Sequence, residues 1–127
     1  MIQTIRLFLL CEGASFAVAG MIHRGLLIAG YAHTQAAVAE SVIAVVLLGG
    51  LGLTWAWPAR TRPIGLVAQA FALLGTLVGV FTIAIGIGPR TAPDLAYHLS
   101  IVVVLVWGLV VAARGPADAT QARPSTG

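Results

Sequence analysis

Four long apolar runs constrain the fold of this chain more than any other feature. They lie at residues 2–22, 35–55, 64–86 and 95–113. A bilayer core about 30 Å thick is crossed by about 20 apolar residues in a helix. Because lipid offers no partners to backbone amides, a run inside it must be helical. The pattern therefore predicts an all-α integral membrane protein, a four-transmembrane-helix bundle, in one domain over residues 1–114.

Composition and charge agree with that class. The chain is 59% hydrophobic and only 9% charged, whereas soluble domains carry about 25% charged residues. The net charge of +3 comes from arginines that are scattered singly, so there is no basic patch to neutralise nucleic-acid phosphates. We therefore expect the lipid bilayer, and not a nucleic acid, as the main partner. The polar tail at 115–127 is predicted to be disordered.

The distribution of the arginines predicts the orientation. Four spans place both termini on one side of the membrane, and cytoplasmic loops carry an excess of positive charge. The side with the termini holds Arg6, Arg60, Arg62, Arg114 and Arg123, against Arg24 and Arg90 on the other. Both termini are therefore expected in the cytoplasm, with the 23–34 and 87–94 loops outside.

Glu12 is the most informative polar residue, because it lies near the middle of the first run. A charged carboxylate at that depth costs at least about 2.5 kcal/mol, so it must face protein or water, or be protonated. Ser15 flanks its helix face, and Gln69 and Thr76 share a face of the third helix. Two interpretations stay open. These residues form a polar path for protons, or a protonated Glu12 is hydrogen-bonded inside the bundle as part of its packing.

A second polar group is expected at the outer leaflet. His23 ends the first helix, Glu40 lies one to two turns into the second, and Asp94 and His98 share a face of the fourth. Histidine beside carboxylate can ligate a divalent metal or orient an imidazole against a quinone head group. The strong metal spacings are missing and two histidines alone specify little, so neither metal nor haem is expected.

We predict that at least two of His23, Glu40 and His98 meet at a common cavity. Asp94, one turn before His98, would hold its imidazole as a carboxylate partner. Gly75 and Gly79 form a GxxxG pattern on the third helix. That pattern indicates either a packing groove inside the monomer or the face of a homo-oligomer.

Two helices also carry a pattern shared with a known family. The first has Arg6-Leu7-Phe8-Leu9-Leu10 leading to Phe16 and Ala19-Gly20, and the second has Glu40, a Leu- and Gly-rich run at 47–53 and then Thr61-Arg62. In these features the chain resembles the DoxX-like family of small four-helix bacterial inner-membrane proteins. The resemblance implies an accessory role in redox or quinone-linked metabolism, beside a membrane or peripheral oxidoreductase.

Two other classes of function stay open. The chain could be a small proton-coupled transporter or channel that uses Glu12, or a purely structural membrane subunit. It carries no nucleotide-binding loop, catalytic triad or zinc motif, so an enzyme is the less favoured interpretation. The position of the polar side chains discriminates between the classes, because a transporter needs Glu12 beside a wet cavity and a redox subunit needs the histidines around an outer pocket.

Overall fold

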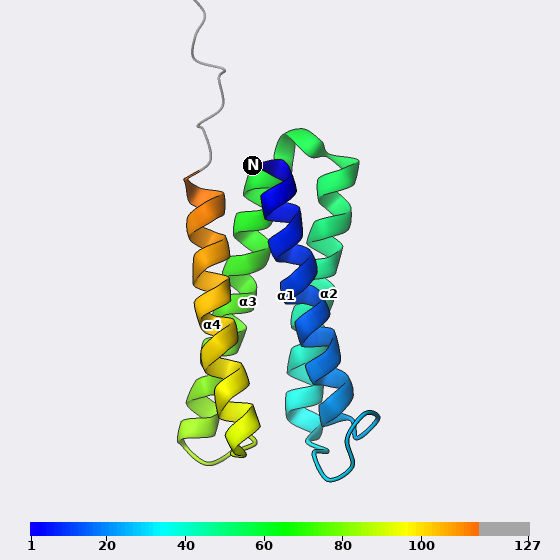
Figure 1. Cartoon of the computed structure of the whole chain (residues 1–127), viewed down its shortest axis with the longest axis vertical. Helices are drawn as coiled ribbons and strands as arrows, with labels where there is room; N and C mark the ends of the chain where they lie inside the picture. The colour runs from blue at the N-terminus through cyan, green and yellow to red at the C-terminus, as the bar shows by residue number, and fades with distance from the viewer. Residues whose placement is uncertain (115–127) are drawn as a thin grey trace, which may run out of the picture.

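A computed structural model describes residues 1–114, and this part of the chain is all α-helical (Figure 1). Its four long helices are α1 (Ile2–His23), α2 (Thr34–Ala56), α3 (Thr61–Ala84) and α4 (Ala92–Ala113), and a short 3-10 turn, η1 (Pro58–Arg60), precedes α3. Successive helices run in opposite directions and pack side by side, and α1 also contacts α3 and α4. The disorder predicted for 115–127 lies outside the described residues.

The helix boundaries follow from local chemistry. The expected start of the fourth helix was three residues late, because Thr91 and Asp94 form a capping box that begins α4 at Ala92. The third also begins three residues earlier than expected, at Thr61, because η1 leads directly into it. It ends at Ala84 rather than at residue 86, where Gly86 adopts a positive φ of 86° that ordinary helix residues avoid.

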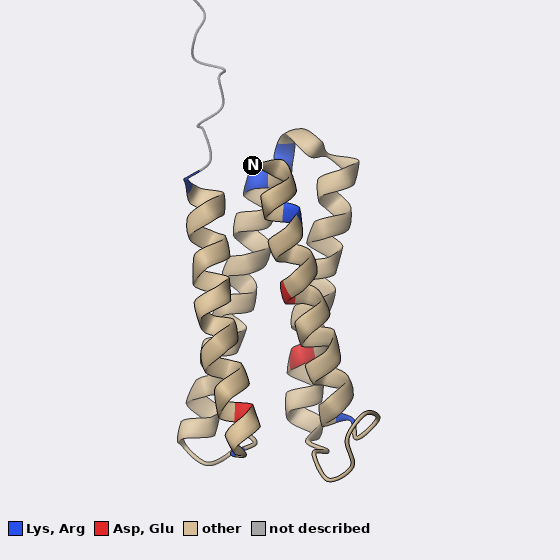
Figure 2. Cartoon of the chain, in the orientation of Figure 1, with Lys and Arg blue, Asp and Glu red and all other residues tan. Residues whose placement is uncertain are grey.

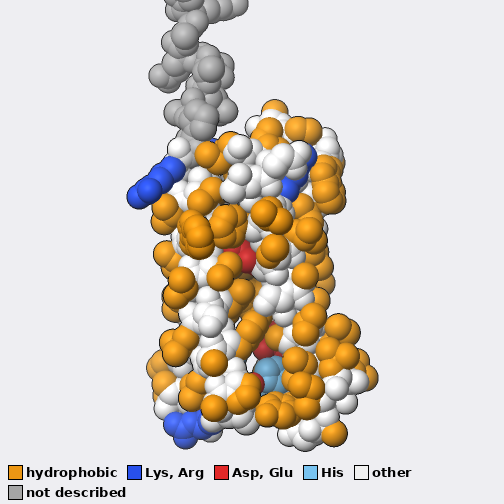
Figure 3. All heavy atoms as spheres, in the orientation of Figure 1, with side chains coloured by type: hydrophobic (Ala, Val, Ile, Leu, Met, Phe, Trp, Pro, Cys, Tyr) orange, Lys and Arg blue, Asp and Glu red, His pale blue; other side chains and the backbone are white. Residues whose placement is uncertain are grey.

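The packing is apolar outside and partly polar inside. Each of the four helices is long and apolar enough to cross a membrane. Large apolar side chains such as Val67, Leu74 and Trp107 are exposed, and Figure 3 shows apolar atoms spread over the length of the visible face. The fully buried positions combine apolar side chains such as Phe16 and Leu105 with Glu12, Gln69 and two threonines. A bundle with this surface is suited to lipid, where the polar groups must find partners in the interior.

The arginine residues lie toward the two ends of the bundle, while the acidic residues lie between them (Figure 2). Met1 and Arg114 are at the same end. There, Arg6 donates from Nη2 to the carbonyl of Thr54 at 2.6 Å and Arg62 donates to the carbonyl of Ala113 at 2.8 Å. These bonds join α1 to α2 and α3 to α4, and they occupy carbonyls near the helix ends that have no intrahelical partner.

Candidate functional site

Glu12 lies inside the bundle, paired with Gln69 of α3. Both side chains are 0% exposed. The Gln69 amide Nε2 donates toward both carboxylate oxygens, at 3.2 Å each. The structure thus brings together two of the four residues proposed for an intramembrane polar site. Within residues 1–114 the Gln69 Oε1 has no hydrogen-bond partner.

Ser15 and Thr76 do not join this pair. The Ser15 hydroxyl donates to the Tyr97 hydroxyl of α4 at 3.0 Å. The Thr76 hydroxyl donates to the Ala72 carbonyl on its own helix. The expected path of four polar groups is therefore divided between separate contacts, and Tyr97 was not anticipated because its partner lies 82 residues away along the chain.

Gly108 of α4 closes over the Glu12–Gln69 pair. A Cβ atom at this position would overlap the Gln69 Nε2 and lie 2.8 Å from the Glu12 Oε1. Sequence reasoning missed Gly108, because nothing local separates it from Gly49 of α2, where an added Cβ would meet no described atom within 4 Å. The α4 backbone therefore packs directly against the buried acid and amide.

Replacing Gly108 with Ala is expected to destabilise the protein by about 1–3 kcal/mol, because the new methyl group forces a buried pair apart. Gly49→Ala makes the same change on a helix surface with open space. It should be neutral or stabilising, since Ala favours helix by about 1 kcal/mol over Gly. Thermal unfolding in detergent measures both variants. Equal unfolding midpoints for the two variants would show that the close packing of α4 over Glu12 does not contribute to stability.

His23 is the centre of the outer polar group. Its Nδ1 lies 2.7 Å from the Glu40 Oε2 of α2, and its Nε2 lies 3.1 Å from the Asp94 Oδ1 of α4. All three side chains are buried. The last turn of α1 is thereby joined to the second turn of α2 and the first turn of α4 through a single imidazole.

Both His23 nitrogens face a carboxyl oxygen, and two ionised carboxylates would need a donor from each nitrogen. An imidazole donates from both nitrogens only in its doubly protonated, cationic form. With Glu40 and Asp94 ionised, the cluster of one cation and two anions keeps one net negative charge. Buried ions of this kind are tolerated only when they are paired and hydrogen-bonded. His23 is therefore the counter-charge on which both carboxylates depend.

The prediction that the Asp94 carboxylate bonds the His98 imidazole was wrong. One Asp94 oxygen accepts hydrogen bonds from the backbone and hydroxyl of Thr91, and the other faces His23. The His98 Nδ1 lies 2.7 Å from the backbone carbonyl of Asp94 instead. Because a carbonyl only accepts, Nδ1 carries the proton, and in the neutral ring Nε2 is left as an acceptor.

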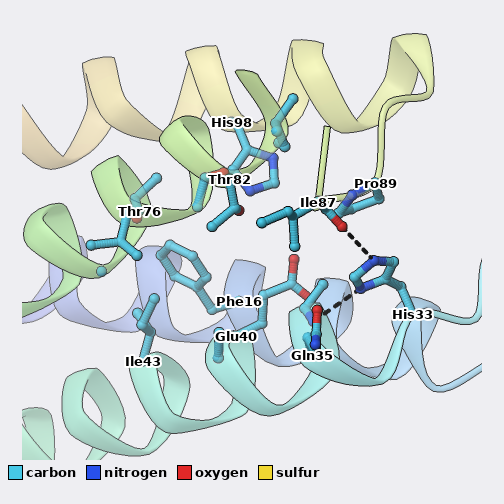
Figure 4. Close-up of a pocket in the computed structure, with 17 residues that line it drawn as sticks. Phe16, His33, Gln35, Glu40, Ile43, Thr76, Thr82, Ile87, Pro89 and His98 are labelled. Carbon is cyan, nitrogen blue, oxygen red and sulfur yellow. Dashed lines mark hydrogen bonds between the residues drawn. The ribbon is translucent and has the colours of Figure 1, made fainter. Parts of the chain in front are cut away.

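Glu40 and His98 both line a cavity of about 160 Å³. Figure 4 shows them on opposite sides of it. Phe16 and Ile43 close its inner end. Its exposed lining residues are Ala39 and Val78 on α2 and α3, together with Gln35 and Ile87 near the loops. Glu40 is 4% exposed, and its Oε1 has no hydrogen-bond partner among the described residues. The cavity therefore contains one buried carboxylate oxygen whose bonding capacity is unused.

The GxxxG glycines of α3 also line this cavity. A Cβ at Gly75 would lie 3.0 Å from Ile43, and one at Gly79 would lie 3.4 Å from the His98 Nε2. These positions thus face α2 and α4 inside the monomer. Glycine there keeps the space beside His98 open.

No family model matches this chain, and neither does any curated protein or solved structure. The site is therefore interpreted from its own geometry. Across residues 1–114, no group of three or more histidine, cysteine or acidic side chains is arranged to hold a metal ion.

Replacing His23 with Ala should destabilise the protein by about 3–5 kcal/mol, because it leaves buried carboxylates without their counter-charge. His33 is the control, since it caps α2 through the Ala36 amide and lies outside the ion cluster. Loss of such a cap costs about 1 kcal/mol. Unfolding midpoints in detergent compare the two variants. A shift no larger for His23→Ala than for His33→Ala would contradict the proposed role of the cluster.

Proposed function

We propose that this protein is a multi-pass protein of the bacterial inner membrane, with both termini in the cytoplasm. It acts there as an accessory subunit of redox metabolism that binds a quinone-class head group in the outer-leaflet cavity. The single observation that carries the proposal is the Glu40 Oε1, a buried carboxyl oxygen without a partner in residues 1–114, on a side chain that lines an otherwise mainly apolar cavity. A buried acceptor normally has a hydrogen-bond partner, so this oxygen favours a ligand that donates a hydrogen bond at that point.

The dimensions and walls of the cavity support a ring-shaped, lipid-soluble ligand. A volume of about 150 Å³ in an apolar protein interior holds a single benzene-sized ring, and this cavity measures about 160 Å³. Phe16, Ile43 and Ile83 provide apolar walls, while Glu40 and His98 provide polar contacts. Its opening between α2 and α3 gives a head group a route from the bilayer, and an apolar tail could stay in the lipid.

The accessory role is supported by what the cavity contains. Its titratable lining residues are Glu40, His98 and His33. The lining hydroxyls of Thr76 and Thr82 donate to backbone carbonyls rather than to a base. Binding and positioning of a ligand are therefore the chemistry that this site supports. The electron acceptor or donor would come from a partner, a membrane or peripheral oxidoreductase, in agreement with the DoxX-like resemblance.

A proton-coupled transporter that uses Glu12 is the second candidate. It is supported by the full burial of an acid near mid-span. However, Glu12 is not among the residues that line the outer cavity, and both its oxygens already face Gln69. This arrangement favours an internal packing contact, and it gives the outer cavity the stronger claim to function.

Filling the cavity should weaken binding. Gly79→Leu places an isobutyl group beside His98, while Gly52→Leu makes the same change on α2 where an added Cβ meets no described atom within 4 Å. The probes are a short-tailed benzoquinone and its benzoquinol, with binding measured by equilibrium dialysis against protein in nanodiscs. We expect Gly79→Leu to weaken binding at least roughly tenfold, which corresponds to about 1.4 kcal/mol, and Gly52→Leu to bind like the wild type. A wild-type protein that binds neither form would refute the proposed function.

The orientation is tested with reporter fusions. A phosphatase that is active only outside the cytoplasm should be inactive when fused after Arg114 and active when inserted in the loop that follows Gly86. The end of the bundle where α1 begins and α4 ends carries four arginines, which are Arg6, Arg60, Arg62 and Arg114. Segments rich in positive charge stay in the cytoplasm. Activity of the fusion after Arg114 would reverse the orientation.

A further inference from the structure

The polar atoms in the buried part of the cavity are acceptors. The Glu40 Oε1 is a carboxyl oxygen without a partner in residues 1–114. In the neutral His98 ring, Nε2 is an acceptor, because the Nδ1 proton is donated to the Asp94 carbonyl. The Gln35 side chain also lines the cavity and carries an amide donor, but it is exposed at the start of α2.

The threonine hydroxyls and the His33 ring of the lining are already hydrogen-bonded. The Thr76 and Thr82 hydroxyls donate to the carbonyls of Ala72 and Gly79, each at 2.7 Å. His33 accepts from the Ala36 amide through Nδ1, so its Nε2 carries the proton, which is directed at the Ile87 carbonyl at 3.3 Å. Each of these hydrogens is therefore directed at the backbone, and the hydroxyl oxygens can offer only lone pairs to a ligand.

We infer that the cavity selects the reduced form of its ligand, a quinol, over the oxidised quinone. This inference rests on the proposed function, and it names which redox state binds. A quinol carries two hydroxyl donors at opposite ends of its ring, and the cavity offers acceptors on opposite sides (Figure 4). A quinone carries two carbonyl acceptors in the same places, so it would leave the Glu40 Oε1 unpaired and bring oxygen lone pairs toward it.

Electrostatics act in the same direction. With both carboxylates ionised and His23 doubly protonated, the cluster of His23, Glu40 and Asp94 carries one net negative charge beside the cavity. A hydroxyl that donates to a carboxylate forms a charge-assisted hydrogen bond, which is stronger than a neutral one. Such a bond is worth about 10- to 100-fold in affinity, and this is the preference for quinol that we expect.

The decisive experiment uses the wild-type protein and four ligands of the same ring and tail. They are a short-tailed benzoquinol, its monomethyl ether, its dimethyl ether and the corresponding quinone, each titrated in nanodiscs without oxygen. We expect the quinol to bind about 10- to 100-fold more tightly than the quinone. The ethers should lose affinity stepwise as the donors are removed. Because this test needs no variant, a folding defect cannot obscure it.

Glu40→Gln is the matched variant, because it keeps the shape of the side chain. The His23 Nδ1–H would bond the amide oxygen, and the amide NH₂ would take the place of the free oxygen in the cavity. A donor there should favour a quinone carbonyl. We therefore expect the ratio of quinol to quinone affinity to fall by about tenfold or more, while Glu12→Gln, away from the cavity, leaves the ratio unchanged.

The outcomes separate this inference from the function on which it rests. Equal binding of quinol and quinone by the wild type would overturn the redox preference and leave the quinone-class site standing. Tighter binding of the quinone would also overturn it. Binding of neither ligand would remove the site itself. A preference for quinol that persists undiminished in Glu40→Gln would show that the Glu40 oxygen is not its source.

Discussion

The interaction on which this bundle depends is the double contact of His23 with Glu40 and Asp94. Ionised groups inside a bilayer are expensive unless each has a partner. One imidazole meets this need for two carboxylates, at 2.7 and 3.1 Å, and so fixes α1, α2 and α4 relative to one another. With these helices fixed, Glu40 and His98 are held on either side of the space that α3 leaves open at Gly79. The cavity is thus a consequence of the ion cluster.

Small residues complete the packing where polar groups cross between helices. Lipid provides no hydrophobic force that would press helices together, so close approach must come from side-chain size. Gly108 lets the α4 backbone reach the Glu12–Gln69 pair. Gly65 of α3 leaves room for the Ile5 side chain of α1 to pack against the α3 backbone. In the same structure Gly49 and Gly52 of α2 meet no described atom within 4 Å of an added Cβ. Glycine content alone therefore does not identify the tight contacts.

The sequence was sufficient to predict four apolar spans, because these depend on neighbours in the chain. It also identified Glu12 and Gln69 as candidate polar residues. It could not give the rotation of each helix about its axis. The i, i+4 spacing of Asp94 and His98 thus suggested a carboxylate–imidazole bond, whereas Asp94 turns to His23 and only its backbone meets His98. The Ser15–Tyr97 bond and the role of Gly108 depend on that same rotation.

The structure distinguishes two buried acids that look alike in the sequence. Glu12 has both oxygens directed at one amide, with the α4 backbone closing over it, and it lies outside the cavity lining. Glu40 has one oxygen bound to His23, while the other faces the cavity with no partner in residues 1–114. An unused acceptor of this kind is costly unless a ligand or water satisfies it. A hydrogen-bond donor at the Glu40 Oε1 would remove this cost, and this difference makes Glu40, rather than Glu12, the residue suited to the proposed binding.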